Sequence, residues 1–241
     1  MNQQNEENKN YSGLEKLYDT EIGMPHYNSH IVKNIQKSFK AKHGDKSKYE
    51  VLDFGAGVGS LAKILKGKYL FNVECVEIDP VQQLELTRNG FINFSTLKDC
   101  GKKYKFIYSS NVLEHIEDDL GALKNLYESL EVGGVFVIYV PALPFLFSDF
   151  DKSVGHFRRY RRKSLEEKVK SAGFSNIKSK YCDSIGILGN LLVKIVGYDE
   201  VVGQNKYLLR IYDTYLFPIS IIADIFLKKI IGKNILLSCT K

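Results

Sequence analysis

The sequence predicts an α/β protein with a mostly parallel sheet that carries helices on both faces. Short apolar segments alternate along the chain with helical segments, which is the order typical of strand–helix–strand units. The segment 135–140 is a continuous apolar run, and such a run suits a strand that helices bury on both faces. Both observations favour a layered domain built around one sheet.

Residues 50–60 form the stretch around which the chain is organised: a short apolar strand, a glycine-rich turn and the start of a helix. Gly55 and Gly57 have no Cβ, so the backbone there can approach a ligand closely. The helix that follows offers unpaired N–H groups to polar or anionic groups. Glu77 ends the next strand, at about the interval at which ribose-binding acids follow nucleotide-binding turns. The turn therefore predicts a ligand of nucleotide type.

The remaining elements follow from apolar periodicity and turn residues. We expect strands at 50–54, 73–78, 91–94, 105–109, 135–140, 176–181 and 234–240. We expect helices at 27–39, 61–66, 81–89 and 119–130, and one that opens with a capping box at 164–167 and stops at Gly173. Gly67 and Gly90 are expected to end the helices before them. The irregular excursion at 141–163 is long for a compact domain, and such loops are usually functional.

Three motifs together resemble the class I S-adenosylmethionine (SAM)-dependent methyltransferases. Residues 51–60 (VLDFGAGVGS) and 76–80 (VEIDP) look like the first two motifs of that family, and 113–115 (LEH) resembles the segment after its fourth strand. The resemblance covers about 46–183 and 233–241, and it implies a seven-stranded Rossmann-like sheet whose last strand is antiparallel. A dinucleotide-binding domain is the competing interpretation, but it expects Gly or Ala where this chain has Ser60.

The resemblance implies SAM as the methyl donor and S-adenosylhomocysteine (SAH) as its product. Glu77 is expected to hold the ribose, and residues 55–57 the methionine end. A Tyr-Asn pair lies over the cofactor in relatives, and Tyr27 with Asn28 matches it; the alternative is a helix that only packs on the sheet. The complete set predicted for the donor is Tyr27, Asp53, Gly55, Ala56, Gly57, Glu77, Ile78, Thr96, Leu97, Ser110 and Asn111.

Methyl transfer is an in-line displacement, so the protein mainly aligns the acceptor and excludes water. A hydroxyl acceptor also needs a base, and His115 and His156 are candidates because a neutral imidazole takes a proton near pH 7. Asp149 and Asp151 would orient His156 or act as the base themselves. Each of these residues also has a structural alternative. His115 would be a histidine of the turn, His156 would support the loop, and the two aspartates would pair with arginines.

Residues 155–160 (GHFRRY) are similar to a segment of methyltransferases associated with glycan and lipid-linked sugar assembly. The resemblance implies set positions for Arg158, Arg159 and Tyr160, and a forked guanidinium suits a phosphate or carboxylate on the substrate. A solvated basic face is the alternative. We therefore predict methyl transfer to a hydroxyl of a sugar, glycan precursor or lipid-linked intermediate. A nucleic-acid or protein methyltransferase and a non-catalytic interaction protein remain open.

The composition is that of an ordinary soluble globular protein, with 44% hydrophobic and 26% charged residues. The net charge of +6 is moderate, and no nucleic-acid partner is expected. The four cysteines lie far apart without a C-x-x-C pair, which argues against a zinc site, and we expect no metal. No signal peptide and no apolar run of ~18 residues is visible, so a cytoplasmic location is expected, with membrane association left open.

We divide the chain into an N-terminal tail and helical cap at 1–45, a methyltransferase core at 46–183 and 233–241, and a helical lid insertion at 184–232. Helices are expected at 185–196, 206–217 and 219–231, the last with one polar stripe of Ser220, Asp224 and Lys228. Its wide apolar face must be covered by something. The core, a second copy of the chain and a membrane surface are the three possibilities. Core packing is the commonest fate of such helices, whereas an apolar lid with basic flanks would suit a lipid-linked substrate and an anionic membrane.

Overall fold

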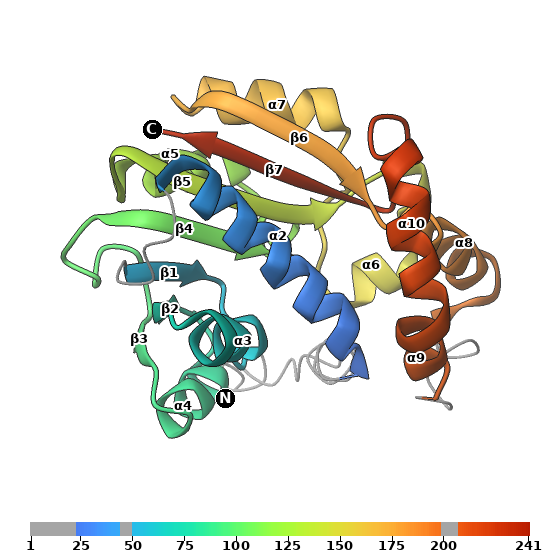
Figure 1. Ribbon diagram of the computed structural model, residues 1–241, viewed down its shortest axis with the longest axis horizontal. Helices are drawn as coiled ribbons and strands as arrows, with labels where there is room; N and C mark the ends of the chain where they lie inside the picture. The colour runs from blue at the N-terminus through green and yellow to red at the C-terminus, as the bar shows by residue number, and fades with distance from the viewer. Residues whose placement is uncertain (1–22, 44–49, 199–206) are drawn as a thin grey trace, which may run out of the picture.

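The computed structural model describes residues 23–43, 50–198 and 207–241. The strands form one seven-stranded sheet in the order β3-β2-β1-β4-β5-β7-β6 (Figure 1). Strands β1 to β5 pair in parallel, and β7 runs antiparallel to both of its neighbours. The predicted Rossmann-like seven-stranded sheet with an antiparallel last strand is confirmed.

The strands are β1 (Glu50–Phe54), β2 (Asn72–Val76), β3 (Ile92–Phe94), β4 (Tyr104–Ser110), β5 (Leu130–Pro141), β6 (Ser175–Cys182) and β7 (Asn234–Thr240). The helices over the sheet are α2 (Pro25–His43), α3 (Ser60–Tyr69), α4 (Pro80–Arg88), α5 (Asp119–Glu128) and α7 (Arg162–Ser171). Shorter turns of helix are η1 (Leu113–His115), η2 (Pro144–Leu146) and α6 (Asp149–Ser153). The insertion holds α8 (Gly186–Val196), α9 (Tyr207–Ile211), η4 (Tyr212–Leu216) and α10 (Phe217–Leu227).

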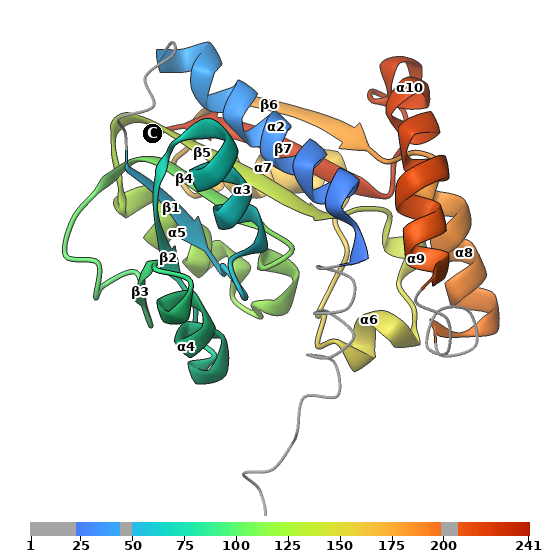
Figure 2. The same ribbon diagram turned by 60° about the horizontal axis from the view of Figure 1, so that its bottom comes forward.

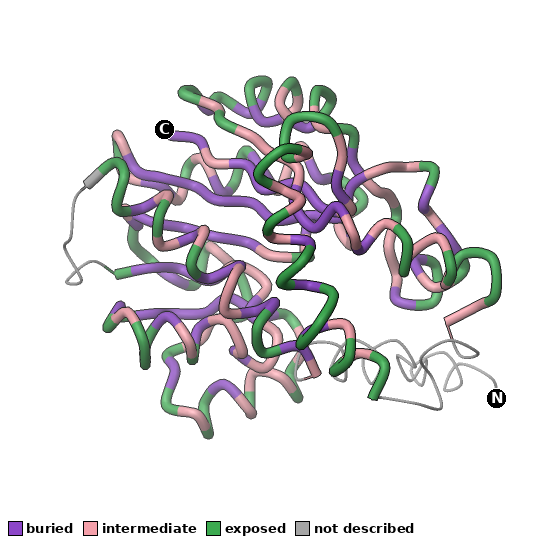
Figure 3. Tube along the Cα trace, turned by 45° about the vertical axis from the view of Figure 1, so that its right-hand side comes forward, coloured by how far each residue is buried: buried purple, intermediate pink, exposed green. Residues whose placement is uncertain are grey.

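The chain builds the sheet in two directions from its centre, where β1 and β4 pair. Since strand–helix–strand crossovers are right-handed, opposite directions place the helices on opposite faces. One face accordingly holds a core cluster with Ile35 of α2 and Leu65 of α3, and the other holds one with Leu126 of α5 and Val169 of α7. Figure 3 shows the strands buried between these layers and the outer turns of the helices exposed.

Several predicted helix boundaries are wrong. In the insertion, the predicted break between 217 and 219 is absent and the last helix ends at Leu227 instead of 231. Helix α3 runs past Gly67, because Tyr69 still packs against the core, and it ends where Leu70 adopts a φ of +58°. Helix α7 begins at Arg162, so Ser164 lies inside it instead of capping it. The Leu165 N–H already donates to the Arg161 carbonyl, and this bond sets the start of the helix.

The excursion at 141–163 is partly helical, because it contains η2 and α6. A capping interaction that the sequence analysis did not predict opens α6. The Ser148 N–H and hydroxyl both donate to Asp151 Oδ2, at 2.9 and 3.0 Å. The excursion is therefore a folded element with a buried carboxylate at its centre.

The insertion between β6 and β7 is helical, as predicted, and η4 forms a π-helical link between α9 and α10. Helices α8, α9 and α10 stand together beyond the carboxyl ends of the parallel strands in both ribbon views (Figures 1 and 2). Among the described residues, no helix combines the length and the apolar character that crossing a membrane requires. Most of the predicted N-terminal tail lies outside the described residues; α2 is the described part of the cap.

Gly55→Ala is expected to destabilise the fold by about 2–4 kcal/mol, through overpacking and a strained backbone. A Cβ at Gly55 would lie 2.3 Å from Val112 Cγ2, and φ is +76° there. Urea unfolding measures the change. Gly67→Ala is the matched control, because its Cβ would meet nothing within 4 Å in the last turn of α3. It should stabilise by ~0.5–1 kcal/mol. Wild-type stability of Gly55→Ala would contradict the packing described here.

Candidate functional site

A cavity of about 2320 Å³ opens at the carboxyl ends of the parallel strands. Every residue predicted to bind the methyl donor lies in its lining, although the residues come from separate parts of the chain. They are Tyr27, Asp53, Gly55, Ala56, Gly57, Glu77, Ile78, Thr96, Leu97, Ser110 and Asn111. The structure thus brings this whole set together at one place.

The glycine turn is fixed directly to the end of β2. The Gly55 N–H donates to the Val76 carbonyl at 2.8 Å, and positive φ angles at Gly55 and Gly57 let the backbone turn there. The Glu77 carboxylate accepts from the N–H of Gly57 at 2.8 Å and from that of Asp79 at 3.0 Å. Each carboxylate oxygen keeps a lone pair that a ligand hydroxyl can use.

The ends of β1 and β4 are also joined by polar contacts. Asp53 is buried and accepts a hydrogen bond from the Tyr108 hydroxyl at 2.6 Å. Asn111, directly after β4, has a φ of +54°, and its N–H donates to the Tyr139 carbonyl at 2.8 Å. Non-glycine residues with positive φ are strained and concentrate at ligand sites. The turn after β4 is therefore held in a constrained form at the cavity.

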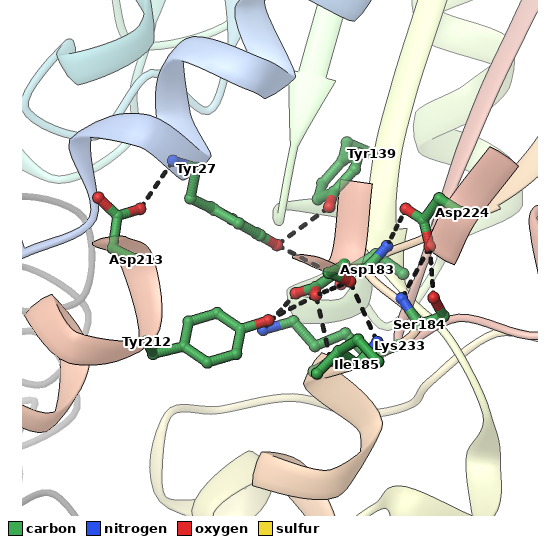
Figure 4. A network of polar contacts seen from close by, with 12 residues as sticks. Tyr27, Tyr139, Asp183, Ser184, Ile185, Tyr212, Asp213, Asp224 and Lys233 are labelled. Carbon is green, nitrogen blue, oxygen red and sulfur yellow. Dashed lines mark hydrogen bonds and ion pairs between the residues drawn. The ribbon is translucent and has the colours of Figure 1, made fainter. Parts of the chain in front are cut away.

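Tyr27 lines the cavity but belongs equally to a buried polar network (Figure 4). Its hydroxyl lies 3.0 Å from the Tyr139 hydroxyl and accepts from Asn234 Nδ2 at 2.8 Å. Its backbone N–H donates to Asp213 at 2.8 Å. These contacts fix the start of α2 beside the cavity, so the structural and the cofactor interpretations of Tyr27 are compatible.

The two candidate histidines come together from separate segments. His115 ends η1 and His156 lies in the excursion, and their rings meet edge-on with centroids 4.5 Å apart. The Phe157 N–H donates to the Glu114 carbonyl at 2.8 Å, which ties the excursion to η1. Both histidines line the cavity.

Asp151 orients His156 from behind. It is fully buried, and His156 Nδ1 lies 2.8 Å from its Oδ1. Arg159 Nε and Nη2 donate to the same carboxylate at 2.8 and 3.0 Å. Burial alone would raise the pKa of Asp151, but the hydrogen bonds from His156 and Arg159 outweigh it and lower the pKa to about 2. A carboxylate only accepts hydrogen bonds, so Nδ1 carries the proton and Nε2 of a neutral ring keeps its lone pair.

Glu114 is a residue that the sequence analysis did not select. It is fully buried, and neither carboxyl oxygen has a hydrogen-bond partner within the described part of the chain. It lines the cavity, with Oε1 3.9 Å from His156 Nε2. Burial raises the pKa of Glu114 to about 8. The signal in the sequence was its place in the LEH segment, between the apolar Leu113 and the candidate His115.

His115 has the opposite shift. Burial, followed by the neighbouring His156, lowers the pKa of His115 to about 4. Its imidazole is therefore neutral at physiological pH, and it is a weaker base than an ordinary histidine. The ligand atoms of Glu114, His115 and His156 all lie within 4.8 Å of one another, a spacing that could hold a metal ion, where the sequence analysis expected no metal.

The other residues predicted for the acceptor side lie elsewhere. Asp149 is at the surface, with a side chain 95% exposed and 2.9 Å from Lys152 Nζ. Arg158 pairs with Asp119 at 2.8 Å, and the Tyr160 hydroxyl donates to the same carboxylate at 2.9 Å. The structure therefore gives these three side chains surface or scaffold positions, outside the cavity lining. Arg159 lines the cavity, as predicted for a substrate-binding position.

The helices of the insertion also contribute to the cavity. Gly189 and Asn190 of α8 lie in its lining, together with Leu208 and Leu209 of α9 and Tyr212 of η4. The Tyr212 hydroxyl donates to the buried Asp183, in the turn between β6 and α8 (Figure 4). The cavity thus has a polar side on the sheet and a more apolar side on the insertion.

Comparisons with known proteins agree with this arrangement. A family model described as a methyltransferase domain matches residues 24–179, which is more than half of the chain. A search of curated proteins finds no significant match.

Solved structures share the fold. A SAM-dependent methyltransferase from Archaeoglobus fulgidus superposes with a TM-score of 0.59 at 14% identity, over 89% of this chain and 94% of that one. Phosphoethanolamine N-methyltransferase 2 of Haemonchus contortus, in complex with SAM, has a TM-score of 0.55 at 16% identity. That match covers 87% of this chain but only 52% of the longer enzyme. The cyclopropane synthase MmaA2 of Mycobacterium tuberculosis has a TM-score of 0.51 at 14% identity, over 87% and 82%.

Glu77→Ala is expected to weaken SAM binding by about 1–3 kcal/mol, the range for a lost hydrogen bond to a charged group. Isothermal titration calorimetry with SAM measures the affinity. Glu167→Ala, on an exposed position of α7, is the matched control and should bind like the wild type. An unchanged affinity of the Glu77→Ala variant for SAM would contradict the assignment of Glu77 to the ribose site.

Glu114→Gln is expected to make the stability of the protein depend less on pH between about 4.5 and 8. The folded protein keeps the Glu114 proton up to about pH 8, whereas the unfolded chain loses it above the ordinary pKa of 4.5. The wild type therefore loses stability as pH rises through this window, and the variant lacks this loss. Urea unfolding at about pH 5 and about pH 8 measures both slopes. An identical change in the free energy of unfolding between the two pH values in both proteins would refute the buried, protonated state of Glu114.

Proposed function

Because the chain belongs to the family of methyltransferase domains, we propose that it transfers a methyl group from SAM to a hydroxyl of a small-molecule acceptor. The main observation in support is that His115, His156 and Glu114 meet in the same cavity as the residues predicted to bind the donor. The acceptor that we propose is a sugar, a glycan precursor or a lipid-linked intermediate.

The residues present fit SAM. Glu77 accepts hydrogen bonds from the N–H groups of Gly57 and Asp79 and keeps lone pairs for ribose hydroxyls. The turn residues 55–57 line the cavity without a large side chain. When bound, SAM supplies an electrophilic methyl group on a positively charged sulfur, and SAH is the product. The protein has to align the acceptor oxygen with that methyl group and keep water out.

His156 is the base that the geometry favours. Asp151 holds the Nδ1 side of the ring, so Nε2 is the atom that takes the proton from the acceptor hydroxyl. His115 packs against it and stays neutral, because burial depresses its pKa. Glu114, protonated at neutral pH, can donate a hydrogen bond to the acceptor oxygen and help to place it.

Two features support an acceptor that is large and anionic. The cavity of about 2320 Å³ exceeds the ~300–1,000 Å³ typical of a site for one small ligand, which leaves room for an acceptor beside SAM. Arg159 lines it and has a buried Nη1 without a hydrogen-bond partner among the described residues. A phosphate or carboxylate of the acceptor would satisfy that donor.

A screen of acceptors tests the proposal. Purified protein is incubated with SAM and with nucleotide sugars, lipid-linked sugars, phenols, amines, RNA or peptides, and SAH formation is measured. Hydroxyl-bearing sugar or lipid-linked acceptors should be the active class. Methylation of amines alone would overturn the O-methyl proposal, and methylation of RNA or peptides alone would overturn the small-molecule proposal. SAM binding without turnover on any of these classes would favour a non-catalytic protein.

His156→Ala is expected to lower kcat by about 10²–10⁴-fold, the usual contribution of a general base. Asp149→Ala is the matched control: it lies in the same excursion, but its side chain is exposed and outside the cavity lining. Steady-state kinetics with the acceptor found above compare the two variants. A His156→Ala protein that keeps the full rate would return His156 to a structural role.

A further inference from the structure

Helices α9, η4 and α10 follow one another without a break from Tyr207 to Leu227. The side that they turn to the protein combines Leu209 and Phe217, which pack in the core, with a row of polar side chains. Asp213 accepts from the N–H of Tyr27, and Ser220 donates to Asp183 at 2.8 Å. Asp224 accepts from the N–H of Asp183 at 2.7 Å (Figure 4). The polar stripe that the sequence analysis noticed is therefore the buried side, except for the exposed Lys228.

The opposite side of the same helices is apolar and exposed. Large apolar side chains recur there every three or four residues, the spacing of one helix face. With their exposed fractions they are Leu208 (41%), Ile211 (48%), Tyr215 (67%), Ile219 (53%), Ile222 (62%) and Phe226 (77%), and Ile230 (70%) follows in the turn after α10. A helix on the surface of a protein in water shows the reverse arrangement. An exposed apolar side of this kind is unfavourable in water unless something covers it.

Helix α8 adds a second exposed apolar row beside the first. Its members are Leu188 (65%), Leu192 (50%), Ile195 (81%) and Val196 (50%). Both ribbon views show α8 and α10 next to each other at the same end of the molecule (Figures 1 and 2). We call the two rows together the apolar face.

Charge indicates what covers the apolar face. Within the described residues 184–198 and 207–232, the exposed charged side chains are all basic: Lys194, Arg210, Lys228 and Lys229. The acids of these segments, Asp213 and Asp224, are turned inward and hydrogen-bonded. A two-fold contact with a second copy would bring like charges together. An anionic lipid surface instead offers an apolar layer with negative charge at its rim.

We propose that the apolar face docks the protein on an anionic membrane surface, with α8 and α10 lying in the plane of the lipid headgroups. The described helices are not suited to crossing the bilayer, so the contact is one-sided. Leu192, Leu208 and Leu216 are exposed and also line the cavity. The cavity thus opens toward the docked face. An acceptor with a lipid tail enters from the membrane there; this last step rests on the proposed function.

Vesicle co-sedimentation tests the docking itself. The full chain is mixed with vesicles of phosphatidylcholine alone, or of equal parts phosphatidylcholine and phosphatidylglycerol, at low and at high salt. The protein should sediment with the anionic vesicles, and salt should weaken the binding, because screening removes the attraction to Lys and Arg. A protein that stays in the supernatant under all these conditions would overturn the proposal.

Charge substitutions identify the face. The double variant Ile222→Glu and Phe226→Glu should lower vesicle partitioning at least about tenfold, because it puts acids into the apolar contact. The matched control is Leu70→Glu with Val132→Glu, at exposed apolar positions (72% and 93%) outside the insertion. It adds the same charge and should bind far better than the first variant. Equal loss in both would mean that only net charge matters, which also overturns the proposal.

Two further measurements separate the remaining explanations. Light scattering measures the mass in solution: a dimer that the Ile222→Glu and Phe226→Glu variant converts to a monomer would assign the face to a second copy and overturn membrane docking. Activity on a water-soluble acceptor should be the same in this variant as in the wild type, because neither residue lies in the cavity lining. Failure of docking and failure of the methyltransferase proposal are thus told apart.

Discussion

The pairing of β1 with β4 is the constraint on which the rest of the structure depends. Two strands and two helices separate them in the sequence, yet they lie side by side at the centre of the sheet. The chain leaves their carboxyl ends toward opposite faces, so a crevice opens there, as it does at the switch point of open α/β sheets. Gly55 at one end and Val112 at the other pack so closely that a Cβ does not fit between them.

Buried carboxylates organise the other side of the cavity. Within the excursion, Asp151 joins α6 to His156 and Arg159. Asp183 joins the turn after β6 to the insertion and to Lys233. A buried charge is costly unless partners surround it, so each carboxylate holds its neighbouring segments in one arrangement. These polar contacts, together with Phe217 in the core, attach the insertion to the sheet, while another apolar side of the insertion stays exposed.

The cavity and the apolar face share the helices of the insertion. The proposed donor side is built from the sheet edge, which carries Glu77 and the glycine turn. The proposed acceptor side combines His156, the proposed base, and the buried guanidinium of Arg159 with the apolar walls of α8 and α9. An acceptor with a polar head and an apolar tail would match these polar and apolar parts of the cavity. The same helices therefore serve both to close the cavity and to expose apolar surface.

The sequence by itself determined the sheet and selected the candidate donor residues. β1 and β7 have the predicted bounds, and the predicted donor residues share one cavity, because apolar runs and turn glycines act locally. Only the tertiary structure decided the acceptor side: it buried Glu114 without a partner, left Asp149 in solvent and turned the polar stripe of α10 inward. The environment of such a side chain depends on distant segments that pack against it, and no local pattern contains that information.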